Sequence, residues 1–403
     1  MKRFVIPFCL AGVLAACGSP EKPKESADEF VARVNQDLLL RYHEQAVADW
    51  VQETYITPDT EALAAKAEER ALEYYPGAVR ESKAYEGMDV SPESRRAMMR
   101  LRQGLSTPAP DDPAKREEMT TINTRMRSMY SSAKWCPGGP ETCRNLDQLA
   151  DTLVKSRDWD QVLDAWKDWH LTARPLRKDY QRFVELVNEG AKELGYGDLG
   201  EMWRSGYDMS PVEFEAETER LWKQVKPLYD NMHCYARTKL QQKYGKDHVP
   251  DGKPIPAHLF GNMWAQQWNN IFDLLEPYPG VSNLDVTSAL KKQGYDSTRM
   301  TQSAESFYVS LGFPKLPASF WENSMLKRPR DRDVACHASA WNMDTHGDVR
   351  IKQCIEPTEE DLYTISHELG HVYYSLSYLD QPFLFQEGAN DGFHEAIGDT
   401  INL

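Results

Sequence analysis

The first part of the chain shows a helical spacing of apolar residues. Ser26-Ala27-Asp28-Glu29 is a capping box, in which the Ser26 and Glu29 side chains each satisfy a free backbone amide at a helix start. Apolar residues then recur about every four positions, at Phe30, Val34, Leu38 and Tyr42. Because no glycine or proline follows until Pro58, the pattern predicts one long helix that ends shortly before that residue.

The same pattern predicts three further helices before residue 135. They cover about 61–75, a segment opened by Ser91-Pro92-Glu93, and 112–134. In the second of these, a capping serine, a proline at the first helical position and a first-turn acid stand in the order that helix starts prefer. Extended alternation is rare, and the only strand candidate lies around 334–341. The predicted fold class is all-α.

Composition narrows the class of protein. The chain has 403 residues, of which 41% are apolar and 27% charged, enough for one large domain or two packed lobes. The formal net charge is −15. Since phosphate binding needs a basic surface, this charge argues against a nucleic-acid partner.

The N-terminus predicts export. Met1-Lys2-Arg3 precedes an apolar run over 4–16 that is too short to span a bilayer, and Leu14-Ala15-Ala16-Cys17 follows the pattern of a bacterial lipoprotein signal. We therefore expect a signal peptide over 1–16, lipidation of Cys17, a tether over 17–25 and a folded domain over 26–403. The mature protein would then lie on the periplasmic face, held by its lipid at the outer membrane. The alternative is an ordinary secretory signal with an incidental cysteine.

Export changes how the remaining cysteines are interpreted, because an oxidising compartment permits disulfides. Proximity in sequence suggests two pairs, Cys136 with Cys143 across a Pro-Gly-Gly-Pro turn and Cys336 with Cys354. Cys234 would be left as a buried free thiol. The alternative is that all five are small core residues.

A metal-binding pattern occurs near the end of the chain, where His367-Glu368-Leu369-Gly370-His371 has the HExxH spacing. Thr358 can cap a helix here, so both histidines lie one turn apart on the same face and can reach one zinc ion. Glu368 would lie beside the metal, where a base for the attacking water belongs. The alternative is a surface helix with two unremarkable histidines.

The following segment offers a third ligand. Gly392-Phe393-His394-Glu395-Ala396-Ile397-Gly398-Asp399 is expected on the next helix, which can pack back against the first. Glu395 would complete a His/His/Glu site with an open position, and Asp399 would hydrogen-bond the far nitrogen of a ligating histidine. His394 could compete with Glu395 for the ligand position.

Several long motifs go beyond this spacing. They are Trp203-Arg204-Ser205, Pro254-Ile255-Pro256-Ala257-His258-Leu259, Gly261-Asn262-Met263-Trp264-Ala265-Gln266, Cys336-His337-Ala338-Ser339-Ala340-Trp341, Arg350-Ile351-Lys352-Gln353-Cys354, Gly388-Ala389-Asn390 and the run from His367 to Asp399. With them the chain closely resembles the angiotensin-converting enzyme family of peptidyl-dipeptidases, from about Lys24 to its last residue. The resemblance implies a large helical metallopeptidase domain of two lobes around a deep cleft, with N-terminal lid helices and few short strands.

The resemblance also implies roles for single residues. His367, His371 and Glu395 would bind Zn²⁺, and Glu368 would be the general base that later acts as an acid toward the leaving amine. Both disulfide pairs suggested above match disulfides of the family.

Further residues match substrate and ion contacts of the family. His337 would donate to the substrate backbone near the scissile carbonyl, Ala338 would pair with the extended peptide, and Gln266 would contact the substrate's free C-terminal carboxylate. Tyr207 matches a tyrosine of a chloride site. His170 stands where some relatives carry a chloride-binding arginine.

The resemblance predicts an exported zinc peptidyl-dipeptidase, with one departure. The chain stops at Leu403, within the expected helix, whereas members of the family continue. We therefore expect a C-terminally truncated chain without the later substrate and oxyanion contacts. Three alternatives stay open: a helical zinc carboxypeptidase, an inactive zinc-binding lipoprotein remnant, and a scaffold without metal.

Overall fold

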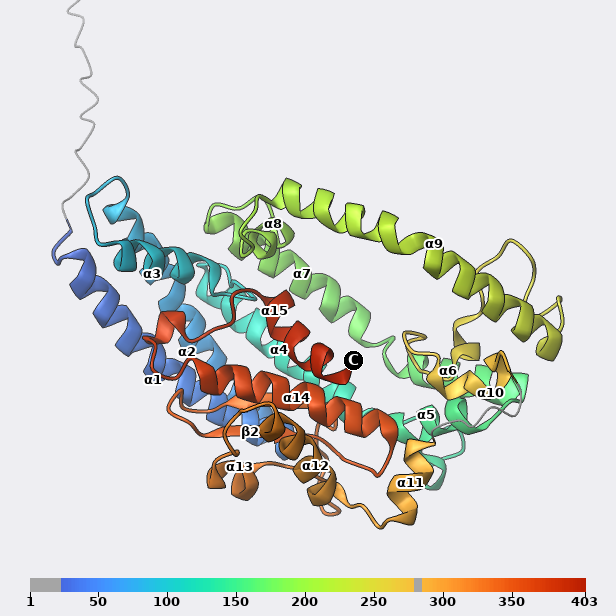
Figure 1. Ribbon diagram of the computed structural model, residues 1–403. Coiled ribbons are helices and arrows are strands. Elements are labelled where there is room, and N and C mark those ends of the chain that lie inside the picture. Colours follow the sequence, from blue (N-terminus) through green and yellow to red (C-terminus); the bar gives the residue numbers. More distant parts are fainter. Residues whose placement is uncertain (1–22, 279–284) are drawn as a thin grey trace, which may run out of the picture.

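The computed structural model describes residues 23–278 and 285–403, and their regular secondary structure is almost wholly helical (Figure 1). The α-helices of these ranges are α1 (Ala27–Thr54), α2 (Pro58–Ser82), α3 (Pro92–Gln103), α4 (Pro113–Ser132), α5 (Leu146–Lys155), α6 (Trp159–Thr172), α7 (Leu176–Glu193), α8 (Leu199–Arg204), α9 (Pro211–Tyr244), α10 (Phe272–Leu275), α11 (Val286–Lys292), α12 (Ser297–Ser310), α13 (Ala318–Asn323), α14 (Glu359–Ser377) and α15 (Asp391–Asn402). Short 3₁₀ helices are η1 (Lys83–Tyr85), η2 (Pro140–Thr142), η3 (Ala257–Phe260), η4 (Asn269–Ile271) and η5 (Phe383–Phe385). The all-α prediction is confirmed.

The first helix begins where its predicted cap stands. The Ser26 hydroxyl accepts the Glu29 N–H at 3.2 Å, and the Glu29 carboxylate accepts the Ser26 N–H at 2.8 Å, so the predicted capping box is present. The second helix starts at Pro58, earlier than expected, because Thr57 caps it and proline is tolerated at a first helical position. It also continues to Ser82, beyond the predicted end.

The only sheet in the described ranges is a two-stranded antiparallel ribbon. β1 (Ser339–Asn342) pairs with β2 (Val349–Lys352), with Ser339 opposite Lys352. The strand predicted around 334–341 therefore begins later than expected, and its partner was not predicted. A four-residue strand carries too short an alternation to stand out from a helix by pattern alone.

Three apolar cores hold the helices together. The first lies among α1, α2, α3, α4, α7 and α8, and the second joins α5, α6, the end of α9 and the segment 249–275. The third lies beneath the ribbon, where α12, α13 and α14 bury side chains such as Phe320, Ile351 and Leu369. Figure 1 shows α14 and α15 next to each other near the middle of the molecule.

The long helix α9 is mostly exposed, and it runs along one edge of the molecule (Figure 1). Ala236 and Leu240, near its C-terminal end, are its buried residues. Cys234 lies on this helix as a free and exposed cysteine, so the prediction of a buried thiol is wrong. The error arose because burial of a helix face depends on a neighbour that local sequence does not reveal.

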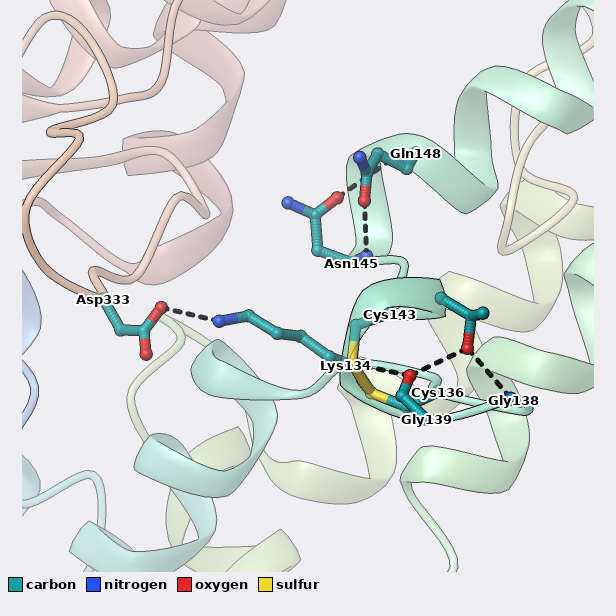
Figure 2. Close-up of a disulfide and its surroundings, with 9 residues drawn as sticks. Lys134, Cys136, Gly138, Gly139, Cys143, Asn145, Gln148 and Asp333 are labelled. Atoms are coloured by element: carbon teal, nitrogen blue, oxygen red, sulfur yellow. Dashed lines mark hydrogen bonds and ion pairs between the residues drawn. A yellow bond between two sulfur atoms is a disulfide. The ribbon is translucent and has the colours of Figure 1, made fainter.

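Both predicted disulfides are present. Cys136 and Cys143 close the Pro-Gly-Gly-Pro turn, which the Thr142 hydroxyl stabilises by accepting the Gly138 N–H and donating to the Gly139 carbonyl, both at 2.8 Å (Figure 2). Next to this turn, Lys134 forms an ion pair with Asp333 at 3.0 Å (Figure 2).

The second disulfide, Cys336–Cys354, joins the segment before β1 to the residues after β2. The disulfide therefore ties the segment that enters the ribbon to the segment that leaves it. This matters for the segment 335–338, which leads into β1 in front of α14.

The segment between α14 and α15 folds back on itself. The Gln386 side-chain amide donates to the carbonyls of Leu379 and Gln381, at 3.1 and 2.8 Å, and the Asn35 side chain on α1 accepts the Leu384 N–H at 2.8 Å. This compact connection brings α15 back along α14. The Asn390 side chain caps α15 by accepting the Phe393 N–H at 2.9 Å.

Two glycines allow α14 and α15 to touch through their backbones. A Cβ atom on Gly398 would lie 2.6 Å from the Cα and the carbonyl oxygen of His367, and a Cβ on Gly370 would lie 2.7 Å from the Cα of Gly398. Such distances are shorter than any van der Waals contact. The crossing therefore requires glycine at both positions.

None of the helices in the described ranges is long and apolar enough to cross a membrane. The predicted signal peptide and Cys17 lie outside these ranges.

Glu68 is a carboxyl buried in the first core. Its side chain is 5% exposed and accepts one hydrogen bond from the Asn123 side-chain amide at 2.9 Å. Burial raises the pKa of Glu68 from 4.5 to about 7, although the positive charge of Arg127 opposes this shift. The folded chain therefore retains a proton here that the unfolded chain releases.

Gly398→Ala is expected to destabilise the fold by about 1–3 kcal/mol, because the added methyl group forces α15 away from α14. Urea unfolding measures this loss. Gly77→Ala in α2 is the matched control, since a Cβ there meets nothing within 4 Å and alanine favours a helix. A Gly398→Ala variant as stable as the control would contradict the close crossing.

Glu68→Gln is expected to gain stability relative to the wild type as the pH rises from 4.5 to about 7. In this window the folded wild type binds more protons than the unfolded chain, so its stability falls with rising pH, by up to about 3 kcal/mol. Unfolding free energies at about pH 5 and about pH 8 test this. Glu73→Gln, an exposed position on α2, should show no such trend.

Candidate metal centre

The histidines of the HExxH pattern lie one turn apart on α14, with their Nε2 atoms 3.1 Å from each other. Glu395 on α15 places Oε2 3.1 Å from His367 Nε2 and 3.7 Å from His371 Nε2. Within the described ranges, His367, His371 and Glu395 are the one group of side chains close enough together to bind a metal ion. Two ligand atoms that each lie about 2.0–2.1 Å from one tetrahedral ion are roughly 3.3 Å apart. The three distances between the ligand atoms lie on either side of this value, from 3.1 to 3.7 Å.

The position of the proton on the His367 ring is also consistent with a cation bound between the three side chains. Asp399 Oδ1 lies 3.0 Å from His367 Nδ1, and because a carboxylate only accepts, we assign the imidazole proton to Nδ1. His367 Nε2 then directs a lone pair at the Glu395 carboxylate. Two lone-pair groups this close repel each other unless a positive charge lies between them. The residues present therefore fit a divalent metal such as zinc.

His394 has a different role from the one considered in the sequence. Its Nδ1 lies 2.6 Å from Nδ1 of His371, on the side of that ring away from the cluster. His394 therefore orients a candidate ligand, as Asp399 does for His367, and Glu395 is the carboxylate of the cluster. The sequence favours Glu395 over His394 because Asp399 follows it by one helical turn, and the cluster has Glu395 as its carboxylate.

Glu368 is buried behind the two histidines, with 7% of its surface exposed. Burial raises the pKa of Glu368 to about 7, the charge of His367 opposes the shift, and Glu395 adds to it. The backbone amide of Ala340 on β1 stabilises the charged carboxylate. A carboxyl with such a pKa can both accept and return a proton near neutral pH.

His337 and Ala338 lie in the extended segment before β1, and this strand packs against α14. The fold therefore brings the predicted substrate contacts to the helix that carries the histidines. Their contact with a peptide stays a prediction.

Three further residues were predicted from the resemblance, namely Gln266, Tyr207 and His170. Gln266 is exposed, in the loop between η3 and η4 next to Ala265, whose φ is +58°. The Tyr207 hydroxyl donates to the Asp391 carboxylate, and His170 stacks on Trp166 with ring centroids 3.9 Å apart. Since a carboxylate already occupies the Tyr207 donor, the geometry does not favour chloride at this hydroxyl. Chloride binding stays a prediction.

Comparison with known sequences places the chain among peptidases. The sequence profile of the family described as angiotensin-converting enzyme matches residues 21–403. The chain is 42% identical over 386 residues to angiotensin-converting enzyme of Sus scrofa, an alignment that covers 94% of this chain and 29% of that enzyme. The corresponding values for Bos taurus are 40% over 383 residues, 94% and 29%.

For angiotensin-converting enzyme of Theromyzon tessulatum, the identity is 44% over 292 residues, with 71% of this chain and 47% of that enzyme covered. The chain thus spans less than half the length of these relatives. The match nevertheless extends over nearly all of the chain and includes the histidine cluster. The protein belongs to the angiotensin-converting enzyme family of peptidases.

Proposed function

We propose that the chain is a zinc peptidyl-dipeptidase that hydrolyses peptides near a free C-terminus and releases dipeptides. The observation that carries this proposal is the meeting of His367, His371 and Glu395 within 4.8 Å, with a buried carboxyl next to them. The family assignment supports the same reaction class.

His367, His371 and Glu395 would hold the zinc ion, and His394 and Asp399 would orient the two rings through their far nitrogens. When bound at such a site, zinc lowers the pKa of a water molecule and polarises the scissile carbonyl. Glu368 would take a proton from the attacking water as its oxygen bonds to the carbonyl carbon. Glu368 would then return that proton to the leaving amine as the peptide bond breaks.

The segment before β1 would position the substrate. His337 would donate a hydrogen bond near the scissile carbonyl, and the backbone of Ala338 would pair with the extended peptide. Gln266 would contact the terminal carboxylate, which would fix the length of the released product. We also infer, from the N-terminal sequence alone, export and lipidation at Cys17.

A matched pair of variants tests the reaction. Glu368→Gln is expected to retain one zinc per chain and to lose turnover of a blocked tripeptide by about 10²–10⁴-fold, because the amide cannot accept the proton. Glu359→Gln, in the first turn of the same helix, is the control and should keep full activity. Zinc binding with no turnover in either chain would instead select a non-catalytic zinc protein. Release of single residues would select a carboxypeptidase.

Asp399→Asn is expected to weaken zinc affinity by about 10–100-fold, because the amide orients the His367 ring and supports its lone pair less well than the carboxylate does. Competition with a chromophoric chelator measures the affinity. Asp380→Asn, in the exposed connection after α14, is the control. Equal affinities in both variants would remove Asp399 from the site.

A further inference from the structure

Lys352 is a buried cation close to the candidate site. It ends β2, and its side chain is only 1% exposed. Its neighbours in the strand, Val349 and Ile351, point to the third core, whereas Lys352 belongs to the opposite face of the ribbon.

All three N–H donors of the Lys352 ammonium have an acceptor. Nζ lies 2.9 Å from Glu53 Oε2 at the end of α1, 2.9 Å from the Ala335 carbonyl and 2.6 Å from the His337 carbonyl. A lysine has three donors and no acceptor, so its hydrogen-bonding capacity is fully used. Burial of an ammonium group is costly unless it is paired in this way.

The two carbonyls belong to alternate residues of the segment that leads into β1, and three connections hold this segment. The Ala335 N–H donates to the Glu53 carbonyl at 2.8 Å, and the Cys336–Cys354 disulfide ties the segment to the residues after β2. Lys352 supplies the third connection. The segment therefore has one position relative to α1 and to the ribbon.

This position is the one that matters for the proposed reaction. The segment carries His337 and Ala338 and continues into β1, whose Ala340 amide stabilises the Glu368 carboxylate. One buried cation thus links the substrate-binding segment, α1 and the neighbourhood of the base.

We propose that Lys352, held by Glu53, is a positioning residue that fixes the segment 335–338 and thereby places His337 and Ala338 for substrate. It acts through this segment and does not touch the reacting atoms. The inference rests on the proposed function for its consequence in catalysis, while the clamp itself is a property of the fold.

The clamp is tested first without turnover, by hydrogen exchange of the zinc-loaded full chain. In Lys352→Met, the amides of residues 334–341 are expected to exchange at least about tenfold faster, with the α14 amides unchanged. If Lys352→Met fails to fold because Glu53 keeps only its longer ion pair with Arg127 at 3.7 Å, the double variant Glu53→Gln/Lys352→Met removes both charges and carries the same expectation. Arg144→Met, which breaks the partly buried ion pair with Asp168, is the control. Unchanged exchange at 334–341 would overturn the proposal.

The consequence for catalysis is tested by a double-mutant cycle. In the otherwise wild-type chain, Lys352→Met is expected to lower kcat/KM by about 10²-fold and to leave the zinc content unchanged. A loss of this size corresponds to a displacement of His337 by roughly 1 Å. In a His337→Ala background the same substitution should cost less than about threefold, because the group that it misplaces is gone. Equal losses in both backgrounds would show that Lys352 does not act through His337.

The two arms separate the proposals. Faster exchange in a chain that binds zinc but turns over no peptide would support the clamp and count against the proposed function. Turnover that is unaffected by Lys352→Met would count against the positioning role of Lys352 and leave the proposed function standing.

Discussion

The candidate metal centre depends on a contact between two helix backbones. Gly398 on α15 lies against His367 on α14, closer than any side chain allows, and Gly370 faces the same crossing. At a wider crossing, Glu395 and Asp399 would move away from the histidines, since both carboxylates extend from α15 at a fixed distance from its axis. The cluster is therefore set by the two glycines as much as by the ligands. The compact connection pinned to Asn35 on α1 makes this crossing reproducible.

Around this crossing the charges are arranged in layers. Two histidines and Glu395 form the inner layer, and Asp399 and His394 orient the rings from outside. Glu368 lies to one side in a buried position that raises its pKa, which distinguishes it chemically from the more exposed Glu395. The same pair of helices thus presents one carboxylate suited to a metal and another suited to proton transfer.

The site draws on parts of the chain that are far apart in sequence. The end of α1 lies some three hundred positions before the ribbon and the α14–α15 pair, yet the ion pair of Glu53 with Lys352 joins α1 to the ribbon. Buried ion pairs of this kind add little net stability compared with apolar side chains, but they tolerate few alternative geometries. Such a pair is therefore suited to fixing the position of the segment 335–338, even where it adds little to the free energy of unfolding.

The sequence by itself determined the helical class, the caps of α1, α3 and α14, both disulfide pairs and the three residues of the candidate metal cluster. These features depend on spacing within one element, or on motifs long enough to be specific. Tertiary structure alone decided that Cys234 is exposed, that β1 has a partner, that His394 supports His371, and that Lys352 is buried. Each of these outcomes depends on which other segment packs against the residue. Local periodicity carries no information about that neighbour, since the same helix or strand pattern is compatible with several packing partners.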